Sequence, residues 1–437
     1  MIARGTGKMR WFLVFWLFVL SAVSYLDRVN ISIAGSSIAE EFHLQQTQLG
    51  WVFSAFLIGY ALFQTPGGWL ADRLGPRQVL TAGVAWWGVF TALTALVSTT
   101  IAGAVLFFVL VRFLLGAGEA IIFPASNQFV SRWIPMQERG IANGLIFAGV
   151  GAGAGAAPVI VTYLMIHYGW RSSFWVSAGL GLLVGVVWFV AARDNPEEHS
   201  YVSGTELKYI EENRTSGNEA SATRDRKATW GTILRSKEVW GVTLSYFCFG
   251  YVAWIFFSWF YIYLLKVRGL DLKSSAFYSA LPSLAIVTCS LLGGAISDAL
   301  TKLHGKRVGR CSVGVFSLLL AALFLVLGSH AENARLASVV LSGGAGALYL
   351  SQSSYWSVTA DIAGPSAGAV SGFMNMGAQL GGALTASLTP AIATQYGWIT
   401  SFHVAAALSV MGALAWLLVD PKRKLAQIPE IVPATEE

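Results

Sequence analysis

Hydrophobic residues gather in long runs separated by short polar turns along almost the whole chain. A helix needs about 20 consecutive apolar residues to cross the hydrocarbon core of a bilayer. The pattern predicts twelve such helices. Their approximate ranges are 11–34, 47–71, 78–98, 101–127, 139–166, 171–192, 239–264, 275–299, 311–329, 335–360, 367–393 and 398–419.

The composition agrees with this pattern. Of the 437 residues, 55% are hydrophobic and 12% are charged, and the mean hydropathy is +0.60. These values exclude an ordinary soluble protein and predict an all-α membrane protein. The first apolar run is too long for a signal peptide and no small-residue cleavage motif follows it, so we expect it to be retained as the first helix.

Basic residues lie in alternate connections between the predicted helices. The positive-inside rule assigns these connections, and both termini, to the cytoplasm. The turn that contains Lys266, Arg268 and Lys273 goes against this pattern. The net charge of +6 therefore reflects topology, and we expect no nucleic-acid partner. The basic residues that fit the rule are Lys8, Arg10, Arg73, Arg77, Arg132, Arg139, the cluster within 302–310, and the cluster within 422–424.

Cysteine and histidine give no sign of a metal or cofactor site in the sequence. The three cysteines belong to three different predicted helices, and the six histidines are isolated from one another. Neither a disulfide framework nor a metal-ligand spacing is present. We interpret the histidines as ordinary residues of loops and helix ends, and we expect no cofactor.

The long polar interruption at 193–238 predicts a partly disordered cytoplasmic linker between two halves. Shifting the chain by 228 residues aligns YGWRSSFWVSAGL (168–180) with YGWITSFHVAAAL (396–408). The halves are therefore parallel repeats, an organisation that is common in secondary transporters. The predicted domains are a six-helix bundle at 1–192, the linker at 193–238, a second bundle at 239–419 and a cytoplasmic tail at 420–437.

The repeat separates shared scaffold from positions specific to one half. Glu119 aligns with Ala347, Arg112 aligns with Val340, and the pair Asp27 and Arg28 has no charged counterpart. The ionisable groups deep within predicted spans belong to the first half, whereas the second half offers neutral polar residues. We expect the first half to handle charge and the second half to form hydrogen bonds with uncharged groups.

Charged side chains within a membrane are costly and are functional candidates by default. Neighbours on a helix point about 100° apart, so Asp27 and Arg28 cannot face the same target. We expect Arg28 to face the centre and clamp a substrate carboxylate with its planar fork. Asp27 is expected to turn towards the fourth helix, with Arg112 as its partner.

Glu119 lies seven residues after Arg112, about two turns along the same helix face. A glutamate in a low-dielectric site favours its neutral form and is suited to accepting a proton. The alternative is that Asp27, Arg112 and Glu119 form a structural charge network that only fixes helix packing.

Four sequence features resemble the major facilitator superfamily. They are GGWLADRLGPR at 67–77, its degraded copy GGAISDALTKLHGKR at 293–307, Arg112 with Gly116 and Gly118, and GVGAGAGAAP at 149–158. The resemblance covers nearly the whole chain. It implies twelve transmembrane helices in two pseudo-symmetric six-helix bundles.

Within that superfamily, the Asp27 and Arg28 pair, with Arg112, Glu119 and Pro124 in the fourth helix, resembles the anion:cation symporter family. That family includes bacterial carriers of sugar acids and aromatic acids, and animal sialic acid and vesicular glutamate carriers. The short connection at 35–46 is more similar to a bacterial inner-membrane member.

The function that these observations predict is proton-coupled symport, in the import direction, of a small hydroxylated organic anion such as an aldonate, uronate or aldarate. The alternatives are an organic-anion exchanger or exporter, or an aromatic-acid carrier of the same fold. No metal-ligand cluster, Ser-His-Asp set or phosphate loop predicts an enzyme. The expected partners are a carboxylate, protons and the bilayer, and the carrier is expected to be a monomer driven by a proton gradient.

The candidate residues fall into three groups. Tyr60 and Asn375 match polar positions of the sugar-acid carriers, although either could instead serve helix packing. The substrate-binding candidates are Arg28, Tyr25, Tyr60, Gln64, Ser353, Ser354, Trp356, Asn375 and Gln379. The proton-coupling candidates are Asp27, Arg112 and Glu119, and the gating candidates implied by the resemblance are Asp72, Arg73 and Arg77.

Overall fold

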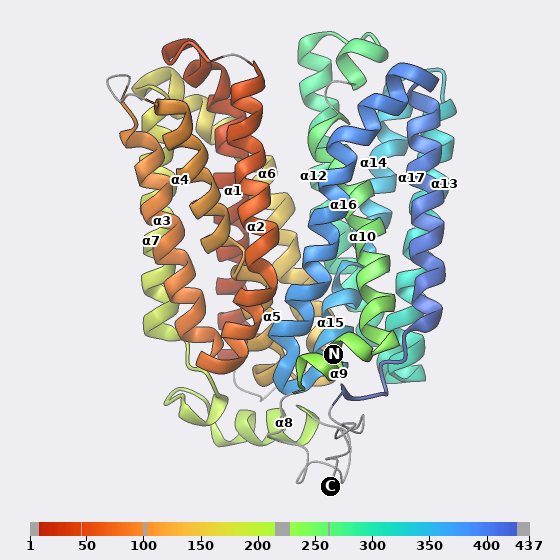
Figure 1. Ribbon diagram of the computed structural model, residues 1–437. Coiled ribbons are helices and arrows are strands. Elements are labelled where there is room, and N and C mark those ends of the chain that lie inside the picture. The colour runs from red at the N-terminus through yellow and green to blue at the C-terminus, as the bar shows by residue number, and fades with distance from the viewer. Residues whose placement is uncertain (1–7, 45, 99–102, 215–227, 261–262, 426–437) are drawn as a thin grey trace, which may run out of the picture.

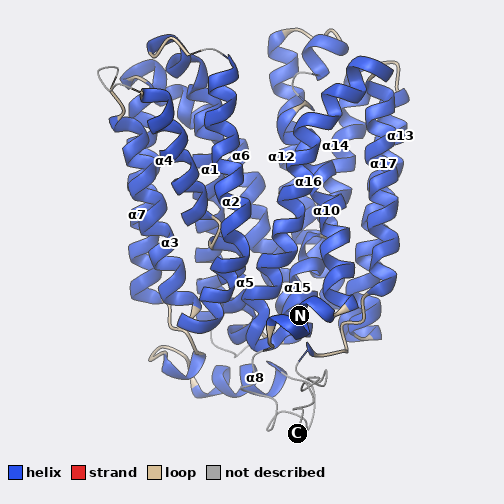
Figure 2. Cartoon of the chain, viewed as in Figure 1, coloured by secondary structure: helices blue, strands red, loops and turns tan. Residues whose placement is uncertain are grey.

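The structure is a computed structural model that describes residues 8–44, 46–98, 103–214, 228–260 and 263–425 (Figure 1). The regular elements in these ranges are all helices (Figure 2). They form two bundles that stand side by side, with the first half of the chain in one and the second half in the other. This is the predicted all-α fold of two six-helix bundles.

The first bundle consists of α1 (Met9–Glu41), α2 (Gln46–Leu74), α3 (Pro76–Leu96), α4 (Ala104–Glu119), α5 (Ile122–Trp133), α6 (Arg139–Tyr168) and α7 (Trp170–Ala191). The connection between the bundles contains α8 (Gly204–Arg214) and α9 (Trp230–Arg235). The second bundle consists of α10 (Lys237–Ser258), α12 (Leu272–His304), α13 (Val313–His330), α14 (Ala334–Leu350), α15 (Gln352–Ala363), α16 (Ala367–Tyr396) and α17 (Trp398–Ala415).

Two predicted spans are each divided into two helices. The span predicted at 101–127 becomes α4 and α5 and continues to Trp133, and the span predicted at 335–360 becomes α14 and α15. Pro124 has no N–H group to bond the carbonyl oxygen of Ala120, which contributes to the break after α4. Counting each divided span once, the described helices give six spans to each bundle. In the described residues, nine spans are long and apolar enough to cross a membrane by length and composition.

Glycines allow close helix packing at equivalent positions of the two bundles. A side chain on Gly153 of α6 would collide with the Ala22 carbonyl oxygen of α1, and one on Gly381 of α16 would collide with the Phe247 carbonyl oxygen of α10. The two glycines are related by the 228-residue shift. The repeat detected in the sequence therefore places equivalent helices in close backbone contact.

The two bundles are joined at one end of the molecule. We call the end where α8 lies the linker end, and the opposite end the far end (Figure 1). Among the described residues, the hydrogen bonds between bundles all involve the linker-end halves of α2, α6, α12 and α16, together with α5, α15 and the turns beside them. The structure is thus closed at the linker end.

The first part of the connection is ordered against the first bundle. Arg10 Nη1 donates to Glu206 Oε1 of α8 (3.1 Å), and Arg10 Nε donates to Glu138 Oε2 (3.1 Å). Tyr209 of α8 donates to Glu138 as well, and burial with this carboxylate raises the pKa of Tyr209 to about 12. The linker was expected to be partly disordered, and residues 215–227 lie outside the described residues.

Candidate functional site

Asp27 and Arg28 diverge from the middle of α1, as their helical spacing predicts. Arg28 turns towards α4 and α2, whereas Asp27 turns towards α3. Both side chains are buried, with an exposed fraction of 0% for Asp27 and 8% for the Arg28 side chain. Two ionised groups at this depth need polar partners, so their contacts define the centre of the site.

Arg28 forms an ion pair with Glu119 at the end of α4. The distance from Arg28 Nε to Glu119 Oε1 is 2.6 Å, and Ser24 also donates a hydrogen bond to Oε1. Glu119 Oε2 is buried without a hydrogen-bond partner, and so is Arg28 Nη2. Each member of the pair therefore retains one unsatisfied polar atom, which is costly unless another group binds there.

Aromatic rings surround the Arg28 guanidinium group. Its Cζ atom lies 4.1 Å from the ring centroid of Tyr60 and 4.6 Å from that of Tyr25. Phe56 and Phe123 lie farther out, at 5.6 and 6.0 Å. The rings stabilise the cation by cation–π interaction while leaving its N–H groups available for hydrogen bonds. The Tyr60 hydroxyl is itself buried without a partner.

Asp27 is held by α3 and not by the expected partner Arg112. Trp87 Nε1 and Thr91 Oγ1 each donate to Asp27 Oδ2 at 2.9 Å. Arg112 instead lies over the ring of Phe56 at 4.7 Å, and its Nε and Nη1 atoms are buried without hydrogen-bond partners. Two strong donors on α3 fix the Asp27 rotamer, so the direct ion pair expected from the sequence does not form.

The candidates of the second half face the first bundle to different degrees. Asn375 Nδ2 donates to Gln64 Oε1 across the two bundles at 2.8 Å. Trp356 Nε1 donates to the Tyr246 hydroxyl (3.1 Å), and its ring lies 5.0 Å from that of Phe147 in the first bundle.

Three further candidates have different surroundings. Ser354 donates to Ser297 of α12, so its hydroxyl is bonded within the second bundle. Ser353 Oγ and Gln379 Oε1 have no hydrogen-bond partner among the described residues. The central candidates are thus Arg28, Tyr60, Gln64 and Asn375.

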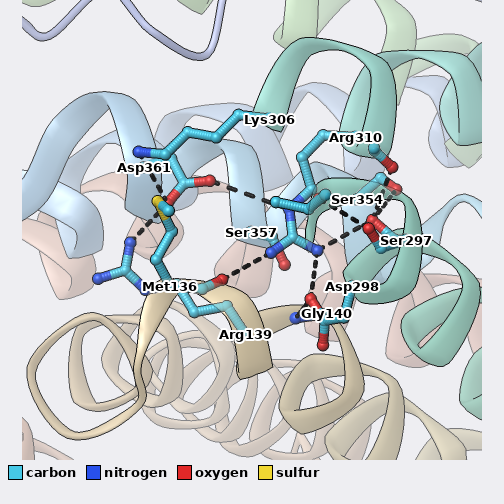
Figure 3. Close-up of polar contacts among 12 residues, drawn as sticks. Met136, Arg139, Gly140, Ser297, Asp298, Lys306, Arg310, Ser354, Ser357 and Asp361 are labelled. Atoms are coloured by element: carbon cyan, nitrogen blue, oxygen red, sulfur yellow. Dashed lines mark hydrogen bonds and ion pairs between the residues drawn. The ribbon is translucent and has the colours of Figure 1, made fainter. Parts of the chain in front are cut away.

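A second polar cluster joins the bundles at the linker end (Figure 3). Arg139 Nη1 donates to Asp361 Oδ1 across the bundles, and Arg310 Nη1 donates to Asp298 Oδ1, each at 2.6 Å. The Lys306 ammonium lies 3.8 Å from Asp361 Oδ1. Burial lowers the pKa of Lys306 below its ordinary value. We call these five side chains the gate cluster.

Two aspartates bind helix N-termini of the opposite bundle. Asp72 accepts hydrogen bonds from the Gly368 and Ala369 amides of α16, at 2.9 and 2.8 Å. Asp298 accepts from the Gly140 and Ile141 amides of α6, at 2.9 and 2.7 Å. A carboxylate is favoured at a helix N-terminus by the free N–H groups and the helix dipole.

The other two gating candidates lie within the first bundle. The guanidinium group of Arg73 lies 4.2 Å from the ring of Trp69. Arg77 Nη2 donates to the Phe189 carbonyl oxygen at 2.9 Å.

Sequence reasoning missed several residues that complete the site. Trp87 and Thr91 bond the candidate Asp27, and Tyr246 bonds the candidate Trp356. A tryptophan or threonine within an apolar run does not by itself indicate a functional site. Asp298 could have been predicted from the sequence, because it occupies the place of Asp72 in the degraded loop copy at 293–307. Asp361 lies just past the predicted end of its span and carried no separate signal.

The chain was compared with known protein families and curated proteins. The family model described as Major Facilitator Superfamily matches residues 17–386 and 304–435. The chain is 35% identical over 402 residues to the probable sulfoacetate transporter SauU of Cupriavidus necator. The aligned residues cover 91% of each chain. It is 30% identical over 341 residues to the probable galactarate/D-glucarate transporter GudP of Bacillus subtilis, covering 77% of this chain and 75% of the relative.

Solved structures share the same architecture. The proton:xylose symporter XylE, bound to 6-bromo-6-deoxy-D-glucose, superposes with a TM-score of 0.76 at 16% sequence identity, covering 95% of this chain and 97% of the symporter. This likeness shows the fold alone.

Proposed function

The chain belongs to the major facilitator superfamily, and from this premise we propose that it imports a small hydroxylated organic anion together with protons. The superfamily consists of membrane transporters, so the chain is a transporter and not an enzyme. The substrate class that we propose covers aldonates, uronates and aldarates. The name of one relative supports this class, because galactarate and glucarate are aldarates. The name of the other supports only the broader class of small organic anions, because sulfoacetate carries no hydroxyl group.

The Arg28–Glu119 ion pair is the observation that carries the proposal. Glu119 occupies one side of the Arg28 fork, while Arg28 Nη2 stays unsatisfied. A proton on Glu119 removes its charge and weakens the pair. Arg28 is then free to bind the substrate carboxylate bidentately, so that protonation and anion binding favour each other.

Asp27 is the second proton-coupling candidate, with Arg112 as the cation that balances it. The four buried side chains Asp27, Arg28, Arg112 and Glu119 carry no net charge when all are ionised. A neutral cluster is the least costly empty state in a low-dielectric site. Loading an anion without a proton would leave a net negative charge there, which is why we propose symport.

Neutral polar groups complete the proposed substrate site. Tyr60 and Gln64 belong to the first bundle, and Asn375 of the second bundle donates a hydrogen bond to Gln64. We propose that these groups, with Tyr25, Trp356, Ser353 and Gln379, bind the hydroxyl groups of the substrate. Ser354 is the weakest candidate, since its hydroxyl is bonded to Ser297.

We propose that the linker end faces the cytoplasm of a bacterial inner membrane, with both termini on that side, because the basic connections lie there. The end at which the bundles are closed is then the cytoplasmic one. The bundle limits 1–192 and 239–419, the linker 193–238, the tail 420–437 and a monomeric state are part of the same proposal. Asp72, Arg73 and Arg77 are proposed to act in gating, with Asp72 holding the start of α16 while the linker end is closed.

The test compares Glu119→Gln with the wild type in liposomes, after a thermal-shift screen with aldonates, uronates, aldarates and sulfoacetate has selected the substrate. A permanently neutral Gln should abolish uptake driven by a pH gradient, whereas exchange of labelled for unlabelled substrate should persist. Glu41→Gln is the matched control. Glu41 is also paired with an arginine, Arg171, which lowers the Glu41 pKa, but the pair lies at the far end of the first bundle.

Gradient-driven accumulation by Glu119→Gln at the wild-type level would exclude Glu119 as the coupling group. Loss of both activities in a variant that still folds and binds would favour the structural-network alternative. An exchanger would show no net uptake in the wild type, and an aromatic-acid carrier would be stabilised by benzoate-type acids in preference to sugar acids.

A further inference from the structure

Two histidines from different helices meet at the far end of the second bundle. His330 is the last residue of α13, and His403 lies in the second turn of α17. Their Nε2 atoms are 3.0 Å apart, with the ring centroids 5.1 Å apart. Both side chains are exposed. The two residues are 73 positions apart, so no sequence spacing predicts the pair.

The nitrogen separation fits two cis ligands of one transition-metal ion. Imidazole nitrogens bind such ions at about 2.0–2.1 Å. At that bond length, nitrogens 3.0 Å apart subtend an angle of about 94° at the metal. This is close to the cis angle of the tetragonal sites that Cu²⁺ and Ni²⁺ prefer. A tetrahedral Zn²⁺ site would require the two nitrogens to separate by about 0.3 Å more.

The metal-free pair reaches the ligand form by a change of tautomer and a small tilt of the rings. Without a metal, one Nε2–H donates to the other Nε2, whereas a metal needs a lone pair on both Nε2 atoms and hydrogens on both Nδ1 atoms. Neither Nδ1 takes part in a hydrogen bond among the described residues, so no contact fixes the tautomers. Exposure leaves room for water at the remaining coordination positions.

We propose that His330 and His403 bind one divalent transition-metal ion, with Cu²⁺ and Ni²⁺ preferred over Zn²⁺. The Arg268 guanidinium group donates to the Ser329 and Ala331 carbonyl oxygens on either side of His330, so a fixed cation lies near the site. This repulsion and the two-residue ligand set give moderate affinity. The bound ion bridges α13 and α17, which belong to the same bundle.

The test uses purified full-length protein with a histidine-free affinity tag, treated with a chelator and then titrated with CuCl₂ or NiCl₂. Calorimetry should show one ion per chain, and the Cu²⁺ electron paramagnetic resonance spectrum should show two coordinated imidazole nitrogens. His330→Ala and His403→Ala should each weaken binding about 100-fold, because chelation by two tethered ligands is lost. His167→Ala is the matched control: His167 is also an exposed histidine, but it is bonded to a backbone oxygen of its own helix.

Thermal unfolding gives a readout that does not depend on the stoichiometry. Ni²⁺ should raise the melting temperature of the wild type and of His167→Ala, and it should leave His403→Gln unchanged. Equal affinity in the wild type and in either alanine variant would overturn the proposal. A spectrum with a single coordinated nitrogen would overturn it as well, since the site requires both rings.

Discussion

At the scale of single residues, the planar fork of Arg28 is the feature on which substrate binding rests. Arg28→Lys keeps the charge but cannot pair with an acid through two parallel N–H bonds. Since a hydrogen bond to a charged group contributes about 1.5–3 kcal/mol, binding should fall about tenfold or more. Arg171→Lys is the control, because Arg171 bonds Glu41 in a half-exposed pair outside the centre. Thermal-shift titration with the selected acid measures both, and near-normal affinity in Arg28→Lys would contradict the assignment.

Asn375 tests whether the second bundle recognises hydroxyl groups. Losing one hydrogen bond to an uncharged group costs about 0.5–1.5 kcal/mol, so Asn375→Ala should weaken binding of a hydroxylated acid about tenfold or less. The loss should shrink for an acid of similar size without hydroxyls. Gln64→Ala removes the partner of Asn375 in this structure and serves as the comparison. Equal losses for both acids would show that Asn375 acts in packing between the bundles.

The sequence predicted which residues are central more successfully than it predicted their partners. Burial of Asp27, Arg28, Arg112 and Glu119 follows from their depth in apolar runs, and the divergence of the first two follows from helical geometry. The predicted partner of Asp27 was wrong. Spacing along a helix gives the depth and relative direction of a residue, but not which neighbouring helix it contacts. That choice depends on how the helices pack, which no local pattern encodes.

At the scale of elements, Arg268 has a structural role in the connection whose charges go against the positive-inside rule. Its guanidinium group caps the end of α13, with bonds from Nη1 to the Ala331 carbonyl (2.8 Å) and from Nη2 to the Ser329 carbonyl (3.0 Å). The last carbonyl oxygens of a helix lack partners within the helix, and a cation there is favoured by the dipole. The residue therefore contributes to the stability of the second bundle.

Removal of this cap should lower stability without changing orientation. Arg268→Ala should reduce the free energy of unfolding by about 2 kcal/mol, since bonds to a charged donor are lost and part-buried carbonyls are left without partners. Arg335→Ala changes a nearby exposed arginine that caps no helix end and should be neutral. Thermal unfolding in detergent compares the two. An equal loss of stability in both variants would show that positive charge at this end of the molecule stabilises the protein, and that the cap on α13 does not.

The element boundaries show which features of the fold hydropathy predicts and which it misses. Hydropathy located the spans because lipid requires apolar surface over the full width of the bilayer. The interruption after Glu119 lies within an otherwise continuous apolar run, and the pattern alone predicted one helix there. The extension of α1 to Glu41 was also missed, because helix beyond the hydrocarbon core needs no apolar residues.

At the scale of the whole molecule, glycines allow the bundles to approach closely at the linker end. A side chain on Gly294 of α12 would collide with the Gly140 carbonyl oxygen of α6. Gly294→Ala should therefore disfavour the closed linker end. Gly155→Ala on α6 is the matched control, since its added carbon would lie 3.6 Å from Ser283 in ordinary contact. Labelling of a cysteine at Thr65, after replacement of the three native cysteines, reports opening between α2 and α16. Equal labelling rates in both glycine variants would contradict the steric explanation.

The charges of the gate cluster predict that removal of a cation and removal of a carboxylate affect closure of the linker end unequally. It contains three cations, Arg139, Lys306 and Arg310, and two carboxylates, Asp298 and Asp361 (Figure 3). Arg139→Gln leaves two cations with two carboxylates, whereas Asp361→Asn leaves three cations with one carboxylate. An uncompensated buried charge costs about 3–5 kcal/mol, so Asp361→Asn should be the more disruptive change.

The Thr65 cysteine measures this difference directly. Asp361→Asn should raise its labelling rate strongly, because separation of the bundles hydrates the surplus cations. Arg139→Gln should raise the rate much less, although each change removes one charge of the same ion pair between the bundles, bonded at 2.6 Å. Adding Lys306→Met to Asp361→Asn reduces the surplus to two cations and one carboxylate, and it should restore part of the closure. If Arg139→Gln opens the linker end as far as Asp361→Asn does, the bond itself holds the bundles together, and the balance of charge does not.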